Sequence, residues 1–287
     1  MANDKLPSVS IIIPTLNEAD YLGYLLFSLS RQTYRDFEVI ISDGSSTDKT
    51  LVSAESFRAQ LPSLKIIISE KRSPAIQRNR GAEKARFKQL LFLDADTILP
   101  NDFLEKSLKE IKKEKLDLAN PISAPLTKKV IDQYYYLVTN WGMDIMQNIF
   151  PLAYGWTIFS KKSLHWKIGG FDEKLAKIAE DTDYIQRAVK NGSKFGIIKS
   201  SSPFVSVRRL DLEGRGGLIK NMLVQGLYFS LFGKYKAQDL IQRPYGNYHK
   251  LKQILVKRRT TSQFLRHLKP QQLTKFLKSL KKLLEEI

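Results

Sequence analysis

The stretch that decides the fold spans residues 9–48, where VSIIIPTLNE at 9–18 is followed by FEVIISDGSSTD at 37–48. Each quoted run begins with apolar, mostly β-branched residues and ends in a polar loop, which is typical of a buried parallel strand. Between them, leucines recur at helical spacing, with Asn17 or Asp20 as the expected N-cap. The stretch therefore predicts a strand, a helix and a second, parallel strand.

The same alternation continues along the chain. We expect further helices after Asp48 and over residues 74–86, 102–115, 131–150 and 180–190, and further strands over residues 65–68, 89–93 and 154–159. Strands that alternate with helices predict an α/β protein with a doubly wound, mostly parallel, Rossmann-like sheet. Such sheets bind their ligands beyond the carboxyl ends of the strands, and polar residues are concentrated in the loops expected there.

Two carboxylates follow the strand expected over residues 89–93. Asp94 and Asp96 flank Ala95, and both should lie on one side of an extended segment because side chains alternate along it. Mg²⁺ usually binds through one or two carboxylates together with substrate phosphates. The pair therefore predicts a divalent-cation site that neutralises a diphosphate; solvated aspartates in a turn are the alternative.

Several motifs, in this order, resemble the glycosyltransferase family 2 enzymes of the GT-A fold. They are the two quoted runs, Arg78-Asn79-Arg80-Gly81, Asp94-Ala95-Asp96, Gly169-Gly170-Phe171-Asp172-Glu173 and Ala179-Glu180-Asp181-Thr182-Asp183. The resemblance covers about residues 8–198. Gln77 and Ala179 depart from the family pattern, which usually has alanine and glycine at these positions.

The resemblance implies an inverting enzyme that takes a sugar from a nucleotide-diphosphate sugar with the help of Mn²⁺ or Mg²⁺. Asp94 and Asp96 would bind the metal, with Asp96 as the direct ligand. The motif positions that would hold the nucleotide-sugar are Pro14, Thr15, Asn17, Glu18, Asp43, Arg78, Asn79, Asp94 and Asp96.

Glu180 and Asp181 stand where a helix is expected to begin. Displacement at an anomeric carbon with inversion needs a base that takes the proton of the acceptor, and a carboxylate at a helix N-terminus is well placed for it. We expect Asp181 to be the catalytic base, and Glu180 and Trp156 to contact the acceptor. Helix capping is the alternative for the carboxylates, and a place in the core is the alternative for Trp156.

Arginine and histidine give weaker signals. Arg208 and Arg209 are expected to contact the diphosphate, because guanidinium groups bind phosphate oxygens in pairs; solvated charge is the alternative. The histidines, His165, His249 and His267, are dispersed and support neither a metal cluster nor a triad. The processive members of the family carry a Gln-x-x-Arg-Trp motif that this chain lacks, which predicts transfer of one sugar.

The net charge of +18 is concentrated near the end of the chain. Residues 200–287 contain 18 lysines and arginines against five aspartates and glutamates, and leucines recur there at helical spacing. This pattern predicts basic amphipathic helices that bind an anionic membrane surface; packing on the catalytic domain or on a second subunit is the alternative. We expect a catalytic domain over residues 1–200, with its nucleotide-sugar half up to about residue 100 and its acceptor half over 101–200, followed by a helical segment over 201–287.

Other features narrow the class of protein. The chain has no cysteine, which excludes disulfides and thiolate chemistry, and it shows neither a secretory signal nor a long apolar run. We expect a cytoplasmic protein, peripheral on the inner face of the cell membrane, that transfers a sugar to a membrane-linked or polysaccharide acceptor. The alternatives are a sugar-nucleotide pyrophosphorylase, whose Gly-x-Gly loop is missing here, and a nucleic-acid-binding protein, which the acidic loops disfavour. No nucleic acid is expected as a partner, and the oligomeric state stays open.

Overall fold

The computed structural model describes residues 5–148, 151–175 and 180–214. They belong to two compact units, one that ends at Val207 and one that begins at Arg208. The second unit is described only by α8 (Arg208–Glu213) and Gly214. In these ranges no helix is long and apolar enough to cross a membrane. The helical segment expected over residues 201–287 therefore lies mostly outside the described residues.

The first unit is built on a seven-stranded sheet with the order β3-β2-β1-β4-β8-β6-β9. Strand β8 runs antiparallel to its neighbours β4 and β6, and the other neighbouring strands are parallel. The predicted mostly parallel sheet is confirmed. The strands are β1 (Val9–Thr15), β2 (Phe37–Asp43), β3 (Leu64–Ile68), β4 (Gln89–Leu93), β6 (Leu118–Pro121), β8 (Thr157–Lys161) and β9 (Phe195–Ile198).

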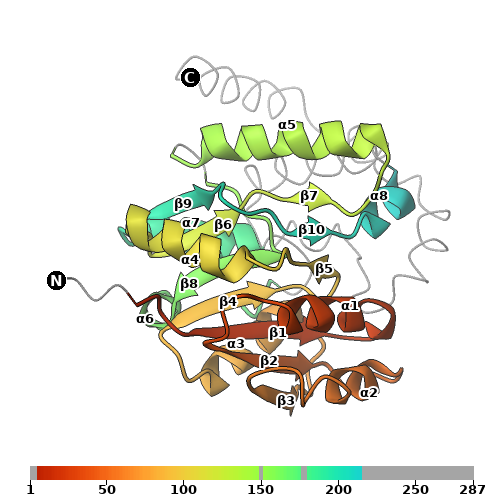
Figure 1. Ribbon diagram of the computed structural model, residues 1–287. Helices are drawn as coiled ribbons and strands as arrows, with labels where there is room; N and C mark the ends of the chain where they lie inside the picture. Colours follow the sequence, from red (N-terminus) through yellow and green to blue (C-terminus); the bar gives the residue numbers. More distant parts are fainter. Residues whose placement is uncertain (1–4, 149–150, 176–179, 215–287) are drawn as a thin grey trace, which may run out of the picture. The chain divides into compact units, whose positions relative to one another are not determined.

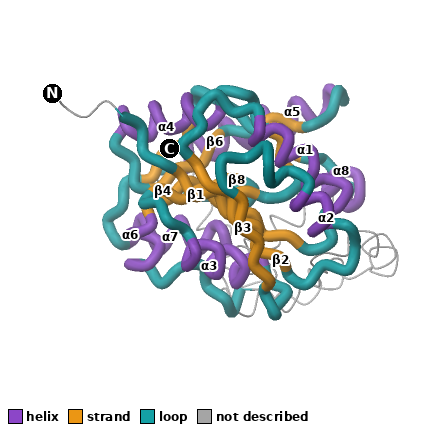
Figure 2. Tube along the Cα trace, turned by 60° about the horizontal axis from the view of Figure 1, so that its bottom comes forward, coloured by secondary structure: helices purple, strands orange, loops and turns teal. Residues whose placement is uncertain are grey.

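Helices cover both faces of this sheet (Figures 1 and 2). Successive side chains of a strand point to opposite faces, so Ile11 and Ile13 enter one core and Ile12 enters the other. The first core is closed by α1 (Ala19–Ser30), α2 (Thr50–Glu55) and α4 (Phe103–Glu114). The second is closed by α3 (Pro74–Lys84), α6 (Lys162–Lys167) and α7 (Glu180–Lys190).

The glycine of the Arg-Asn-Arg-Gly motif allows α3 to lie close to β1. A Cβ atom at Gly81 would lie 2.3 Å from Cγ2 of Ile12, which is shorter than real side-chain contacts. Any larger residue would push the helix away from the sheet. This close packing matters because the site residues Gln77, Arg78 and Asn79 precede Gly81 on the same helix.

A smaller sheet lies at the carboxyl end of β4. It consists of β5 (Thr97–Ile98), β10 (Phe204–Val205) and β7 (Ala124–Pro125), with β10 in the middle. The backbone N–H of Ser206 also donates to the carbonyl of Asp96 at 3.1 Å. This sheet therefore holds the end of the Asp94–Asp96 turn, and the long helix α5 (Val130–Met146) follows it along the chain.

Two local predictions were wrong. The strand expected over residues 154–159 is β8, which begins only at Thr157 because Gly155 and Trp156 form a turn. Neither Asn17 nor Asp20 caps α1, whose N-cap is Glu18. The backbone N–H of Ala19 donates instead to Oδ2 of Asp48 at 3.2 Å, so the loop after β2 caps this helix.

Candidate active site

Hydrogen bonds around Asp43 join the loops after β1 and β2. Its buried carboxylate accepts from Oγ1 of Thr15 at 2.8 Å, and from the backbone N–H and the hydroxyl of Ser46 at 2.7 and 2.6 Å. Asn17, with φ at 57°, accepts from the backbone N–H of Thr47 at 2.8 Å. The structure thus brings Thr15, Asn17 and Asp43 together at the carboxyl ends of adjacent strands. Their contacts with a nucleotide stay predictions.

Two further predicted residues lie beside these loops. Pro14 is buried in β1 and pairs in register with Ser42 of β2. Glu18 is buried at the start of α1, and its backbone N–H donates to Oγ1 of Thr50 at 2.8 Å. Both residues help to shape the end of β1, whatever else they bind.

Gln77 of α3 is a residue whose importance the sequence analysis missed. Its side chain is fully buried, and Nε2 donates to the carbonyls of Thr15 at 2.6 Å and Ser42 at 2.7 Å. The backbone N–H of Gly44 donates to the same Thr15 carbonyl at 2.8 Å. Gln77 therefore connects the ends of β1 and β2 from below the loops. The available signal was its polar side chain at a position where the family pattern has alanine.

Arg78 lies at the centre of the site. Its side chain is 2% exposed, and it contacts Oδ1 of Asp94 at 2.8 Å and Oε1 of Glu180 at 2.9 Å. It also donates to the carbonyl of Gly155 at 3.1 Å and lies 5.2 Å from the ring centre of Phe171. Burial alone would lower the pKa of Arg78, but the two carboxylates raise it above its usual value. A fixed positive charge thus joins the turn predicted to bind a cation to the residues predicted to contact the acceptor.

The Asp94–Asp96 segment differs from its prediction in shape but suits a small divalent cation. It forms a turn between β4 and β5 and is not extended, so the argument from alternating side chains was wrong. The side chain of Asp94 stays 35% exposed, and Asp96 is half-buried. In the described ranges no three His, Cys, Asp or Glu residues are grouped to hold a metal. Two carboxylates suffice for Mg²⁺ or Mn²⁺ when substrate phosphates and water complete the ligands.

Asp181 is the second residue of α7 and is partly buried. Oδ1 accepts from the backbone N–H of Thr182 at 2.7 Å. Oδ2 faces Gly155, where a Cβ atom would lie only 2.5 Å from it. Burial, together with the charge of Glu180, raises the pKa of Asp181 to about 7. A carboxylate with this pKa is a stronger base than an ordinary aspartate and is still partly deprotonated at neutral pH.

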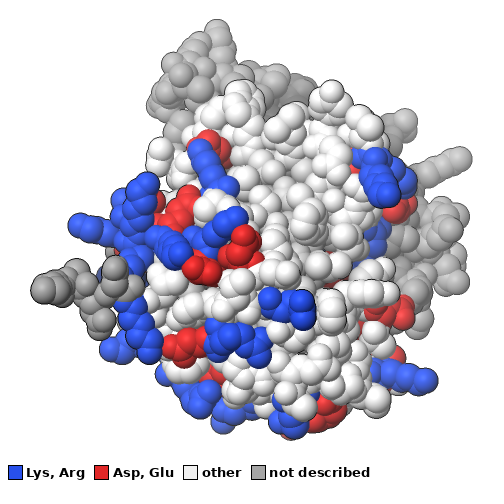
Figure 3. Space-filling view, viewed as in Figure 1, with Lys and Arg blue, Asp and Glu red and all other residues white. Residues whose placement is uncertain are grey.

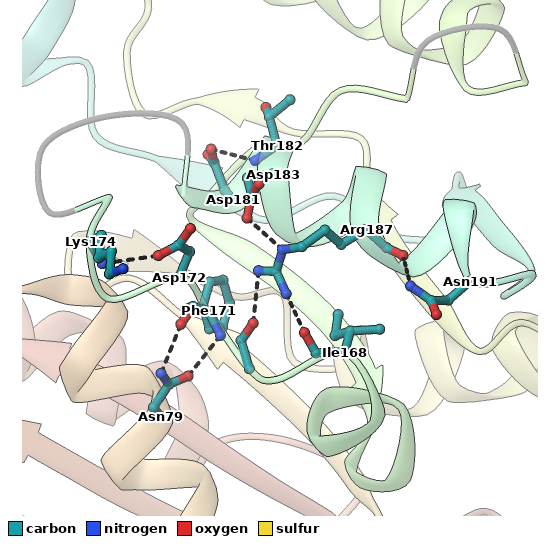
Figure 4. A network of polar contacts seen from close by, with 11 residues as sticks. Asn79, Ile168, Phe171, Asp172, Lys174, Asp181, Thr182, Asp183, Arg187 and Asn191 are labelled. Carbon is teal, nitrogen blue, oxygen red and sulfur yellow. Dashed lines mark hydrogen bonds and ion pairs between the residues drawn. The ribbon is translucent and has the colours of Figure 1, made fainter. Parts of the chain in front are cut away.

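The Gly-Gly-Phe-Asp-Glu turn is held from two sides (Figure 4). Asn79 of α3 donates to the carbonyl of Phe171 and accepts from its backbone N–H, both at 2.9 Å. Arg187 of α7 contacts Oδ2 of Asp183 at 2.7 Å and donates to the carbonyl of Gly170 at 2.8 Å. Asn79 therefore positions this turn, and its predicted contact with the nucleotide stays a prediction.

Trp156 connects the site to a groove beside α5. Its ring stacks on Tyr154 with the centroids 4.3 Å apart, and Nε1 donates to Oγ of Ser123 at 2.7 Å. The groove has a volume of about 330 Å³, and Ser123 and Tyr136 are among its lining residues. Burial raises the pKa of Tyr136, and the charge of Asp96 adds to the effect. The groove thus lies close to both the predicted metal turn and Trp156.

The sequence also singled out an arginine pair and three histidines. Arg208 and Arg209 begin α8 in the second unit, so their contact with a diphosphate stays a prediction. His165 is fully buried among aromatic rings, where its Nδ1 lies 3.1 Å from the hydroxyl of Tyr184. Burial lowers the pKa of His165 to about 3, so it is a neutral core residue at physiological pH. His249 and His267 lie outside the described residues.

Comparison with known proteins shows which family part of the chain matches. The model of the family described as glycosyl transferase family 2 matches residues 10–135. This range contains the Asp43 loops, α3 and the Asp94–Asp96 turn. Residues 10–135 therefore form a glycosyltransferase family 2 domain. The prediction from the motifs is therefore confirmed at the level of the family.

Relatives of this family 2 domain are found in bacteria. A PGL/p-HBAD biosynthesis glycosyltransferase of Mycobacterium bovis is 44% identical over 95 residues, which are 32% of this chain and 37% of the relative. The poly(ribitol-phosphate) beta-N-acetylglucosaminyltransferase TarS of Staphylococcus aureus is 26% identical over 210 residues, which are 70% of this chain and 35% of TarS. Among the first curated relatives, the matches cover only 32% to 42% of the relative's own length.

Solved structures agree with the fold of the domain. The first 349 residues of S. aureus TarS in complex with UDP give a TM-score of 0.60 at 18% identity, covering 94% of this chain and 78% of that one. A mannosyltransferase of Pyrobaculum calidifontis in complex with GDP-Man and Mn²⁺ gives a TM-score of 0.60 at 20% identity, covering 88% and 70%. At these identities the likeness shows the GT-A fold alone.

Proposed function

We propose that the protein is a metal-dependent, inverting glycosyltransferase that moves one sugar from a nucleotide-diphosphate sugar to an acceptor. The observation that carries the proposal is the position of Arg78, which contacts Asp94 of the turn after β4 and Glu180 next to Asp181. Donor and acceptor must meet at one place for transfer. Arg78 joins a residue predicted to bind the donor to a residue predicted to contact the acceptor. The neighbours solved with UDP or with GDP-Man and Mn²⁺ support the same kind of donor.

The proposed chemistry uses Asp181 as the general base. Its carboxylate takes the proton of an acceptor hydroxyl, and the resulting oxygen attacks the anomeric carbon on the face opposite the diphosphate. The bond to the diphosphate breaks with inversion, and Asp181 ends protonated. A cation held by Asp94 and Asp96 would neutralise the negative charge that develops on the leaving group.

The acceptor is proposed to be a membrane-linked glycan or a polysaccharide. Two relatives, a PGL/p-HBAD biosynthesis glycosyltransferase and a poly(ribitol-phosphate) beta-N-acetylglucosaminyltransferase, support an acceptor that is larger than a free sugar. With such an acceptor we propose a cytoplasmic enzyme, peripheral on the membrane. The family match disfavours a pyrophosphorylase, and nucleic acid is not proposed as a partner.

A thermal-shift screen of nucleoside diphosphates with and without Mn²⁺ tests the proposed donor site. A ligand that binds only the folded state raises the Tm by mass action, so one nucleoside diphosphate should raise it in the presence of Mn²⁺. The Asp96→Ala variant should lose most of the shift that depends on Mn²⁺ while keeping the Tm of the free protein. If no nucleoside diphosphate shifts the Tm with Mn²⁺ present, the proposed function is wrong.

A further inference from the structure

Helix α5 presents a wide apolar face that no described element covers. Six large apolar side chains on it are between 58% and 67% exposed: Val130, Ile131, Tyr134, Leu137, Val138 and Trp141. Their spacing of three, four and seven residues places most of them on one side of the helix. A contiguous exposed apolar surface of this kind marks a place where a protein binds another molecule or a membrane. In Figure 3 the surface over α5 carries few charged side chains.

The charges around this face favour an anionic partner. Lys128 and Lys129, which directly precede the helix, are exposed. The acidic residues of α5 do not oppose such a partner, because Asp132 is buried and Asp144 is paired with Lys199 at 2.7 Å. Exposed tyrosine and tryptophan next to lysine is the composition found at the headgroup level of a bilayer.

The apolar face of α5 borders the groove that leads to the candidate active site, and this position indicates what the face binds. The groove beside it is lined by Tyr134 and Leu137 of the apolar face and by Tyr136 and Ser123. Tyr136 and Ser123 both contact Trp156, at a centroid distance of 6.2 Å and through a 2.7 Å hydrogen bond. The residue before Trp156 is Gly155, which Oδ2 of Asp181 faces. A path of contacts thus leads from α5 to the candidate base.

We propose that the outer face of α5 lies on an anionic lipid bilayer and directs a lipid-linked acceptor through the groove toward Asp181. This deepens the proposed function and rests on it only for the acceptor, because binding to a bilayer requires neither donor nor metal. The headgroup region would contact Lys128 and Lys129, while Ile131, Val138 and Trp141 would enter the acyl boundary. Tyr134 and Leu137 would then line the entrance of the groove at the membrane surface.

Co-sedimentation of the full chain with phosphatidylcholine vesicles, with and without phosphatidylglycerol, tests the proposal. The Ile131→Ser/Val138→Ser/Trp141→Ser variant changes exposed side chains that do not line the groove, and should weaken binding to the anionic vesicles by about tenfold or more. The Lys128→Glu/Lys129→Glu variant should weaken binding to anionic vesicles and leave binding to neutral ones unchanged. The matched control, Tyr24→Ser/Phe27→Ser/Val52→Ser, removes three similarly exposed side chains elsewhere and should bind as the wild type.

Other results would overturn the proposal. If the α5 variant binds vesicles as well as the wild type, another part of the chain docks on lipid. If the wild type is a dimer without lipid and the α5 variant is a monomer, the face is an interface between two copies. The circular dichroism spectrum and the Tm of each variant must equal those of the wild type, which shows that the variant folds. If the protein binds vesicles but no nucleoside diphosphate raises its Tm, this proposal is supported and the proposed function is contradicted. The two failures are therefore distinguishable.

Discussion

At Asp181, burial and the charge of Glu180 act on the carboxyl group in the same direction. Both disfavour the charged form, which is why the pKa of Asp181 rises to about 7. The residue keeps this position because Gly155 leaves room for Oδ2 and the backbone of Thr182 holds Oδ1. The motif led us to predict Asp181 as the base, and this role stays a proposal. The sequence could not predict the raised pKa, because the burial that is its largest cause depends on how distant segments, such as the one with Gly155, pack around Asp181.

The raised pKa predicts the pH dependence of transfer. A general base must be deprotonated, so kcat/KM should fall below about pH 7 and level off above it. Glu180→Gln removes the neighbouring negative charge, and the acidic limb of its profile should therefore move to lower pH. Rates measured from pH 5.5 to 9 at saturating Mn²⁺ test this prediction. An acidic limb at the same pH in both proteins would exclude Asp181 as the group that titrates.

The same shift predicts an effect on stability. Asp181 loses its proton near pH 3.9 in the unfolded chain but near pH 7 in the folded one, so stability falls as pH rises through this window and the loss is complete above it. Asp181→Asn should therefore raise the Tm at pH 8 and raise it less at pH 5. Asp20→Asn, a change of an exposed aspartate in the first turn of α1, should change the Tm by the same small amount at both pH values. The proteins are measured without metal or nucleotide; a Tm gain that is independent of pH would contradict the argument.

Among the elements, α3 organises the site through three consecutive residues. Successive residues of an α-helix point about 100° apart, so Gln77, Arg78 and Asn79 reach different loops. Gln77 holds the ends of β1 and β2, Arg78 holds Asp94 and Glu180, and Asn79 holds the turn at Phe171. The family motif pointed to Arg78 and Asn79 as ligands of the nucleotide. The structure shows that all three also fix the loops against the sheet.

Removal of the Gln77 amide should weaken nucleotide binding through the loops. Gln77→Ala leaves the carbonyls of Thr15 and Ser42 without this buried donor, which should destabilise the fold by about 1–3 kcal/mol. The Kd for the nucleoside diphosphate should rise, because the loops are less ordered. Calorimetric titration and urea unfolding measure both effects, with the exposed Arg80→Ala on the same helix as control. Loss of stability with an unchanged Kd would make Gln77 a residue of the core only.

Some features of the strands could not be predicted from sequence patterns. The strands of the first half were predicted because each is a run of buried, mostly apolar residues. The antiparallel direction of β8 was not predicted, since a strand buried on both faces has the same composition in either direction. The strands β5, β7 and β10 have two residues each, too few to show any period.

For the whole first unit, the sheet explains why distant motifs form one site. Parallel strands end at one edge, so the loops after β1, β2 and β4 were predicted to meet, and the structure brings Asp43, Arg78 and Asp94 to this edge. The roles of these residues toward donor and acceptor remain predictions. The groove and the apolar face of α5 were not predicted as an acceptor surface, because the aromatic residues of the helix alone did not show which of them are exposed.

The most direct test of the proposed mechanism is release of nucleoside diphosphate from candidate sugar donors, measured with Mn²⁺ and with a chelator. Wild-type protein should cleave one donor with Mn²⁺ in the presence of an acceptor lipid extract, and chelator or Asp96→Ala should remove most of this activity. The Asp181→Asn variant should no longer transfer the sugar but should still bind the nucleoside diphosphate. Full activity in chelator, or transfer by Asp181→Asn at the wild-type rate, would contradict the proposed mechanism.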